Sequence, residues 1–509
     1  MEKKGKLELT WVGKYEEEKL EPRILIEDKS KSYGDPDSEN MLIHGDNLLA
    51  LKALEDKYNG KVKCIYIDPP YNTGNAFEHY DDGIEHSIWL SMIKTRMEIL
   101  WNLLDKAYGS IWVSIDDDEM PYLRILMDEV CGRQNFIASN VWQKRYSREN
   151  REAIGDVHEY ILVYAQNPIK FKTTRNKIPV SLDEMKAYKN PNNDPKGPWR
   201  PVPMTAQAGH ATKDQFYEIV TPTGVVHTPP EGRCWSLSKA TYEKLLNEGR
   251  IYFGKTGDSQ PNTIRYFSEV EGVVPWTWWP STEVGHTDEA KKEIYALFGK
   301  NNAFDTPKPE RLIERVLHIA TNPGDLVLDA FIGTGTTCAV AHKMKRRWIG
   351  IEMGEQCYEF CETRMKAVVD GEDGGVSKNN KWQGGGGYKF YELAEPLLVK
   401  NKVLPIYQIN PSYSWNMVCE AICKIEGFTY EPSGEFQGYS SENRFIHITE
   451  EFVNTKYVMS VMKNLGEKQS LLIYCKKNQV DMILPENVEV KKIPNDLLDK
   501  CNFESEVQE

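Results

Sequence analysis

The chain lacks long apolar runs and closely paired cysteines. No apolar stretch approaches the roughly 20 residues that a membrane span needs, and the first residues contain no signal-peptide core. These absences predict a cytoplasmic protein. The ten cysteines are scattered, and the pairs Cys357/Cys361 and Cys419/Cys423 have helical spacing without nearby histidines. Zinc sites usually use tighter Cys-x-x-Cys pairs, so the pattern predicts reduced thiols and no metal site.

Positive charge is also scarce, which at first argues against a nucleic-acid partner. The 509 residues carry a net charge of −13, whereas phosphate contacts need Lys and Arg. The distribution is uneven, however. Residues 141–250 hold 17 Lys and Arg against 12 Asp and Glu, while residues 391–509 hold 12 against 18. A modest basic surface is therefore expected in the middle of the chain, although an ordinary mixed surface would give similar counts.

The most informative motif is Asp68-Pro69-Pro70-Tyr71, which follows the apolar run 62–67. Pro69 and Pro70 donate no N–H and fix the backbone, so the carbonyls of the turn are free to accept hydrogen bonds. Asp68 and a neighbouring carbonyl could both accept from one NH₂ group while Tyr71 stacks on the ring that carries it. The alternative is a plain Pro-rich turn after a strand.

A second motif lies far downstream, in residues 325–337. It has the pattern of a buried strand, a turn with Gly333 and Gly335, and a helix start. The next expected strand, 347–352, ends at Glu352. This order is typical of the nucleotide half-site of a doubly wound sheet, in which the acid binds ribose hydroxyls. Position 338 is Cys where a dinucleotide fingerprint needs glycine, so NAD is disfavoured.

Taken together, the two motifs resemble those of the amino-methylating DNA methyltransferases, which use S-adenosylmethionine. In that family an Asp-Pro-Pro-Tyr turn holds the target base, and a Phe-x-Gly-x-Gly turn binds the cofactor. Here the catalytic turn precedes the cofactor turn, and this permuted order with a long insert resembles the β group of the family. The resemblance implies N6-adenine methylation of a base flipped out of duplex DNA.

The resemblance also assigns roles to individual residues. The catalytic residues would be Asp68, Pro69, Pro70 and Tyr71. The residues expected around the methionine portion of S-adenosylmethionine are Asp329, Phe331, Gly333 and Gly335. Glu352 would bind the ribose, Lys308 and Pro309 resemble an additional cofactor motif, and Asp46 is a candidate adenine contact that a helix N-cap would explain equally well.

A closer resemblance is to the modification subunits of type III restriction systems. It rests on the segments 6–11, 284–290 and 305–309, and it covers roughly residues 6–370. It implies duplex DNA as substrate, a restriction (helicase–nuclease) subunit as partner and a homodimer. The alternatives are cytosine-N4 methylation, a non-catalytic DNA-binding subunit, and methylation of RNA or protein.

Strands alternate with helices over residues 40–170 and again over 305–368, which predicts an α/β fold with a doubly wound, mostly parallel sheet. Neither segment completes the sheet alone, so one circularly permuted Rossmann-like methyltransferase domain is expected from both. The predicted organisation is an N-terminal extension (1–39), a catalytic half (40–170), a target-recognition domain (171–300), a cofactor-binding half (301–370), a flexible linker (371–389) and a C-terminal α/β accessory domain (390–509).

Overall fold

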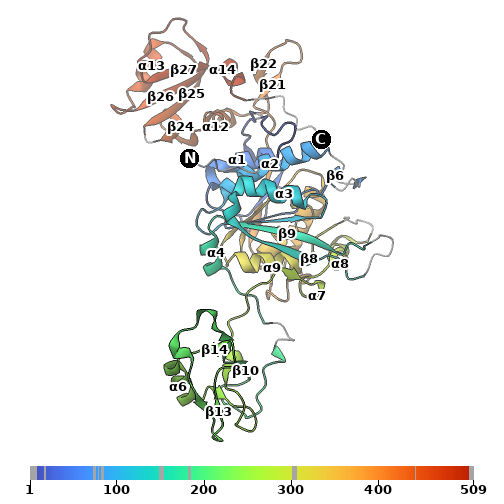
Figure 1. The fold of residues 1–509 in the computed structure, drawn as a ribbon. Helices are drawn as coiled ribbons and strands as arrows, with labels where there is room; N and C mark the ends of the chain where they lie inside the picture. Colours follow the sequence, from blue (N-terminus) through green and yellow to red (C-terminus); the bar gives the residue numbers. More distant parts are fainter. Residues whose placement is uncertain are drawn as a thin grey trace. The chain divides into compact units, whose positions relative to one another are not determined.

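The computed structural model forms two compact units, residues 1–176 with 276–509, and residues 177–275 (Figure 1). It describes residues 8–16, 19–72, 76–77, 80–81, 85–147, 154–180, 185–300, 306–441, 443–501 and 503. The sequence predictions that involve Lys6, Leu7 and Asp305 lie outside these residues.

The larger unit is built on a sheet in which eleven strands are described, in the order β1-β20-β3-β19-β18-β4-β7-β9-β8-β17, with β2 paired to β20. The bounds are β1 (Leu25–Glu27), β2 (Tyr33–Gly34), β3 (Met41–His44), β4 (Cys64–Ile67), β7 (Ser110–Ile115), β8 (Phe136–Gln143), β9 (His158–Ala165), β17 (Trp278–Trp279), β18 (Leu326–Asp329), β19 (Arg347–Glu352) and β20 (Gly387–Leu393). The hairpin β5 (Ala76–Phe77) and β6 (Tyr80–Asp81) lies outside this sheet.

The six consecutive strands from β20 to β7 are parallel to one another. Strands β18 and β19, from the second half of the chain, lie between β3 and β4, from the first half. One sheet is thus assembled from two distant segments, and the predicted fold class is confirmed. Because β4 and β18 are parallel neighbours, the two turns that follow them lie at the same edge of the sheet, where α/β proteins bind their ligands.

Burial on both faces explains why these strands have continuous apolar sequences. All six residues of β7 and all four of β4 are buried, as expected for parallel strands covered by helices on both sides. Helices α1, α2 and α3 pack in succession (Figure 1). Helix α10 packs against both α9 and α11. The helices that precede β20 in this unit are α1 (Asn47–Tyr58), α2 (His86–Leu103), α3 (Met120–Met127), α4 (Pro168–Thr174), α7 (Ser281–Val284), α8 (Thr287–Phe298), α9 (Glu310–Ala320), α10 (Thr336–Lys343) and α11 (Thr363–Val369).

The glycine-rich segment near residue 385 differs from the flexible linker that its composition predicted. Gly387 begins β20, which pairs with β3 inside the central sheet, and β1 from the predicted N-terminal extension pairs with β20. A Cβ atom on Gly387 would lie 2.3 Å from the backbone nitrogen of Asp35. This glycine therefore allows two backbones to pack closely, a role that composition alone does not distinguish from flexibility.

The smaller unit, residues 177–275, lies within the predicted target-recognition segment of 171–300. Residues 276–300, which hold β17, α7 and α8, belong instead to the larger unit. Trp199 and Trp235 are buried in the two small hydrophobic cores of residues 177–275, so these tryptophans serve packing. Its elements are β10 (Trp199–Pro203), β11 (Thr205–Gln207), β12 (Ile219–Val220), β13 (Val226–His227), β14 (Arg233–Trp235), α6 (Lys239–Asn247), β15 (Ile251–Tyr252) and β16 (Asn262–Tyr266).

The C-terminal part of the chain forms a second sheet of mixed direction, in the order β23-β24-β25-β26-β27. Helix α12 packs in one of its hydrophobic cores and α13 in the other. The elements are β21 (Leu398–Lys400), β22 (Tyr407–Ile409), α12 (Trp415–Ile425), β23 (Thr429–Ser433), β24 (Phe436–Ser441), β25 (Arg444–Val453), α13 (Thr455–Met462), β26 (Ser470–Asn478), β27 (Val488–Lys492) and α14 (Asn495–Leu498).

All ten cysteines are free thiols in the structure, and nine of them are buried. Among the residues that the structure describes, no helix has both the length and the apolar character that crossing a bilayer requires.

Candidate active site

The Asp-Pro-Pro-Tyr turn and the residue after it, Asn72, are held in place by hydrogen bonds with side chains of neighbouring elements. The indole Nε1 of Trp89 on α2 donates to the Pro70 carbonyl at 2.8 Å. Asn72 adopts a positive φ of 59°, and its side-chain amide donates to Glu119 Oε1 at 2.9 Å. His86 Nδ1 lies 2.8 Å from the same carboxylate oxygen. The turn is therefore fixed by contacts outside itself, as a preorganised site requires.

Both oxygens of the Asp68 carboxylate are engaged. Lys308 Nζ donates to Oδ1 at 2.8 Å and to Oδ2 at 2.7 Å. The Tyr71 hydroxyl lies 2.7 Å from Asp68 Oδ1 and 3.0 Å from Glu159 Oε2, and it shares its single proton between them. Burial raises the pKa of the Asp68 carboxyl, Lys308 opposes that shift, and the Glu159 charge reinforces it.

The Pro69 carbonyl is the remaining acceptor of the turn. Within the described part of the chain, no donor is hydrogen-bonded to it, whereas the Pro70 carbonyl is taken by Trp89. Since neither proline has an N–H group, the backbone at these two positions offers carbonyl acceptors and no donors. A group that binds the Pro69 carbonyl must bring a hydrogen-bond donor, as an amine does.

The turn after β18 carries the predicted cofactor residues. Asp329 is buried at the end of the strand and accepts a hydrogen bond from the Phe331 backbone N–H at 2.9 Å. Burial raises the pKa of Asp329 to about 7. Gly335 adopts a left-handed conformation at the start of α10, where no side chain caps the helix. The backbone can therefore approach a ligand closely at this turn.

Glu352, predicted to bind a ribose, is 4% exposed and has several partners within the protein. Its Oε2 accepts from Gly333 N at 2.8 Å, and its Oε1 accepts from Met353 N at 3.1 Å and from the Gln356 side chain at 2.9 Å. The carboxylate thus connects the end of β19 to the glycine turn. In this structure it orients the turn, and its predicted role at the ribose stays a prediction.

Asp46 acts as the N-cap of α1. Its Oδ1 accepts from Leu49 N at 2.9 Å, and its Oδ2 lies 3.3 Å from Arg96 Nη2. The next residue, Asn47, donates from its side chain to the Ala330 carbonyl at 2.9 Å. The N-cap alternative is therefore what the structure displays, and the same segment ties the end of β3 to the turn after β18.

A cavity of about 330 Å³ adjoins the catalytic turn, with Lys308 and Glu159 in its wall. Lys144, Arg145 and Lys291 also line it. Lys144 Nζ lies 3.6 Å from Glu159 Oε1 and 2.8 Å from Asp156 Oδ2. The cavity wall thus holds four basic side chains against two acidic ones, and one of the basic side chains, Lys308, contacts Asp68.

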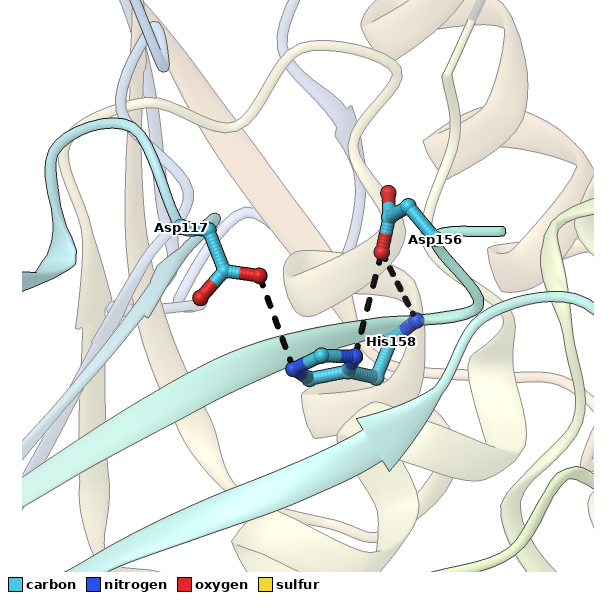
Figure 2. Close-up of side chains that lie close together, drawn as sticks. All are labelled: Asp117, Asp156 and His158. Carbon is cyan, nitrogen blue, oxygen red and sulfur yellow. Dashed lines mark hydrogen bonds and ion pairs between the residues drawn. The ribbon is translucent and has the colours of Figure 1, made fainter. Parts of the chain in front are cut away.

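Asp117, Asp156 and His158 form a cluster of side chains (Figure 2). His158 Nε2 lies 3.6 Å from Asp117 Oδ2, and His158 Nδ1 lies 3.8 Å from Asp156 Oδ1. Both aspartates are more than half exposed, and Asp156 already pairs with Lys144. Ion pairs and solvent therefore account for the cluster without a metal ion.

The structure brings together most of the predicted site residues. Asp68 directly follows one strand and Asp329 ends the adjacent one, and Lys308, predicted as part of a cofactor motif, contacts the Asp68 carboxylate. The predicted role of Lys308 at the cofactor stays a prediction. Sequence reasoning missed Glu159, which faces Tyr71 and Lys308. The available signal was an acid at the start of the otherwise apolar strand β9.

A permuted, mostly parallel sheet that places an Asp-Pro-Pro-Tyr turn beside a Phe-x-Gly-x-Gly turn defines the class of amino-methyltransferases. The family model described as DNA methylase, N6_N4_Mtase, matches residues 62–363. This match covers more than half of the chain and spans both motifs. The chain belongs to this DNA methylase family.

Relatives among curated proteins carry a narrower description. The StyLTI Mod subunit of a type III restriction-modification enzyme from Salmonella typhimurium is 35% identical over 352 residues, which cover 62% of this chain and 51% of the relative. The probable HindVI Mod subunit from Haemophilus influenzae is 31% identical over 428 residues, 72% of this chain and 55% of the relative. The chain spans about half the length of these two relatives.

The fold also resembles a solved putative DNA modification methylase from Thermus thermophilus. The identity is 15%, the TM-score is 0.34, and the match covers 70% of this chain and 100% of the other.

Proposed function

We propose that the protein transfers a methyl group from S-adenosylmethionine to the N6 amino group of adenine in duplex DNA. The observation that carries this proposal is the Asp-Pro-Pro-Tyr turn after β4, with its Pro69 carbonyl free among the described residues, beside the glycine turn after β18. Asp68 and the Pro69 carbonyl can both accept from one exocyclic NH₂ group. Such bonds favour the pyramidal nitrogen that attacks the methyl group, and they hold it in line.

The target base has to leave the duplex before its amine reaches Asp68, at a cost of a few kcal/mol. The Tyr71 ring offers a stacking surface, and base–aromatic stacking contributes about 1–3 kcal/mol. The cations that line the neighbouring cavity suit the phosphates on either side of a flipped nucleotide. Together these groups could bind the extruded nucleotide by its base face, its amine and its backbone.

The residues at the β18 edge fit S-adenosylmethionine. The start of α10 lacks a side-chain cap, so its backbone N–H groups suit the methionine carboxylate. The acidic side chains at this edge, Asp68, Asp329 and Asp46, suit the positive sulfonium. When bound, the sulfonium supplies an electrophilic methyl group. The chain's own part is to place the amine against it and to keep the carboxylate beside the amine charged.

We further propose that the protein acts as the modification subunit of a type III restriction-modification system. The names of the relatives, which are Mod subunits, support this proposal. It implies a restriction (helicase–nuclease) partner, a homodimer, and a cytoplasmic location where DNA is accessible. Residues 177–275, which form a separate compact unit inserted into the catalytic unit, would be the target-recognition domain.

The test is transfer of labelled methyl from S-adenosylmethionine to unmethylated genomic DNA, followed by nucleoside analysis of the digest. Genomic DNA is suitable because it contains every short recognition sequence. We expect label in N6-methyladenine with the wild-type protein and none with Asp68→Ala. Binding of S-adenosylmethionine by Asp68→Ala, measured by calorimetry, controls for folding.

Each result leads to a different conclusion. Label in N4-methylcytosine would overturn the adenine assignment while keeping the chemistry. Full activity in Asp68→Ala would overturn the mechanism. Methylation of RNA or protein in place of DNA would refute the proposed substrate.

A further inference from the structure

We propose that Lys308 is a positioning residue for Asp68. Lys308 holds the Asp68 carboxylate charged and oriented until the target base arrives, and the Lys308 ammonium then moves onto Glu159. The inference rests on the proposed function, because it concerns how the same site receives an amine. It assigns Lys308 to the base side of the site and gives Glu159, which has no role in the site so far, a place in the reaction cycle.

The contacts of Lys308 carry the first step. Its ammonium donates to both oxygens of Asp68, at 2.8 and 2.7 Å, from a side chain that is only 7% exposed. Pro309 fixes the backbone that follows Lys308 and leads into α9. A buried ammonium that bridges two carboxylate oxygens sets both the charge of that carboxylate and its rotamer.

The second step is that the Lys308 ammonium occupies the place that the amine of the base requires. It is a nitrogen donor on Asp68, and it lies 5.0 Å from the centroid of the Tyr71 ring. The target amine would need the same carboxylate oxygens, and the base would need the same aromatic face. Lys308 therefore mimics the substrate in the free protein and has to withdraw when the base enters.

Glu159 offers the place to which Lys308 can withdraw. Its Oε2 already lies 3.5 Å from Lys308 Nζ, so a small movement of the ammonium group would bring it from Asp68 into close contact with Glu159. The Tyr71 hydroxyl already bridges Glu159 and Asp68. The adjoining cavity, which both Lys308 and Glu159 line, gives the flexible lysine stem room to move.

Charged and titratable groups approach Asp68 from every side. Lys308 comes from the segment before α9, Glu159 from β9, Asp329 from β18, and Tyr71 and Tyr66 from the catalytic segment itself. Lys308 is the one cation among these groups in the described structure. Without it, Asp68 would be buried between two carboxylates and would gain a proton at higher pH.

The experiment is the pH dependence of kcat/KM for methyl transfer to unmethylated genomic DNA, because kcat/KM reports ionisations of the free enzyme. For Lys308→Met we expect the fall of activity on the acidic side to move up by about 1–2 pH units, with recovery at high pH. Lys308→Arg should stay close to the wild type. Glu159→Gln should move the acidic fall in the opposite direction, since it removes a negative charge facing Asp68.

Lys292→Met is the matched control. It removes an exposed lysine of α8 that does not line the cavity and has no contact with Asp68 among the described residues, so its acidic fall should coincide with that of the wild type. A merely structural defect would lower activity at every pH without moving the profile, so superimposable profiles for Lys308→Met and the wild type would overturn the proposal. If Lys308→Met is inactive at every pH, the Glu159→Gln variant decides: a pH profile for Glu159→Gln that coincides with the wild type would also overturn the proposal. A wild-type protein that methylates no DNA refutes the proposed function itself, a result distinct from either of these.

Discussion

Replacing Glu310 with alanine should destabilise the cofactor side of the sheet more than any surface change nearby. Glu310 begins α9 and is 2% exposed. Its Oε1 accepts from Lys343 Nζ at 3.0 Å and from Arg364 Nη2 at 2.8 Å, and its Oε2 accepts from Val376 N at 2.9 Å. One carboxylate therefore links the start of α9 to α10, to α11 and to the loop after α11.

The magnitude follows from what the substitution leaves behind. Lys343 and Arg364 are both buried. Lys343 keeps a second carboxylate partner, Glu372. Among the described residues, Arg364 keeps hydrogen bonds to hydroxyl and carbonyl oxygens only, including Thr336 Oγ1 at 2.9 Å. Removing one partner of a buried ionic network costs about 3–5 kcal/mol because an uncompensated charge remains. We expect a loss of that size, and a transition that is lower by roughly 6–12 °C.

The assay is calorimetric unfolding at pH 7, with Glu314→Ala as the control. Glu314 lies one turn further along α9, is partly exposed, and accepts hydrogen bonds only from the side chains of Asn379 and Asn380 in the described structure. Its replacement should cost less than about 1 kcal/mol. Equal transitions for the two variants would refute the idea that the buried network holds the helices together.

The pH dependence supplies a second check on the same residue. Burial acts to raise the pKa of Glu310, but Arg364 and Lys343 outweigh it and hold the pKa below its usual value. A depressed folded-state pKa gives stability that is present at neutral pH and is lost as the pH falls through the acidic range. The difference between wild type and Glu310→Ala should therefore shrink on acidification. A constant difference would contradict the assignment.

Three further predictions concern the site. Tyr71→Phe keeps the stacking ring and removes the hydroxyl between Asp68 and Glu159, so kcat should fall roughly tenfold with KM for DNA unchanged; an unchanged kcat in steady-state assays would count against that hydroxyl. Gly350→Ala would place a Cβ 2.4 Å from Cys338 Sγ and should cost about 1–3 kcal/mol in thermal unfolding, whereas an unshifted transition would mean that the strand adjusts freely. Burial raises the pKa of Asp329 to about 7, so its contribution to stability is present at acidic pH and is lost as the pH rises through 7. Asp329→Asn should flatten that decline in stability, and parallel curves of stability against pH for the two proteins would contradict the prediction.

Local sequence was sufficient for the elements that are buried on both faces. The expected strand at 347–352 has the bounds of β19, and the apolar run 62–67 contains β4. Each of these strands is a continuous apolar segment ended by a polar residue. The direct pairing of β4 with β18 is a finding of the structure, and it agrees with the general rule that ligands bind at the carboxyl ends of parallel strands.

What the sequence could not supply is the pairing of side chains across long separations. Lys308 and Asp68 are 240 positions apart, and nothing in either local segment marks them as partners. The glycines near residue 385 were misinterpreted for a related reason, since close packing of Gly387 against Asp35 is a property of two backbones. Where a residue's role depends on one distant neighbour, composition and spacing have no access to it.

The insert, residues 177–275, is flanked on both sides by residues that are hydrogen-bonded to the catalytic unit. Asn176, just before the insert, has its backbone N–H and its side chain bound to carbonyls at the end of α9. Thr277, just after it, accepts a hydrogen bond from Val141 of β8 at 2.7 Å. Both ends are thus fastened to the catalytic unit, and residues 177–275 have their own cores. The sequence of the insert can therefore change without disturbing the catalytic turn. With the insert as the recognition domain proposed above, the same methyl-transfer site can serve different DNA sequences.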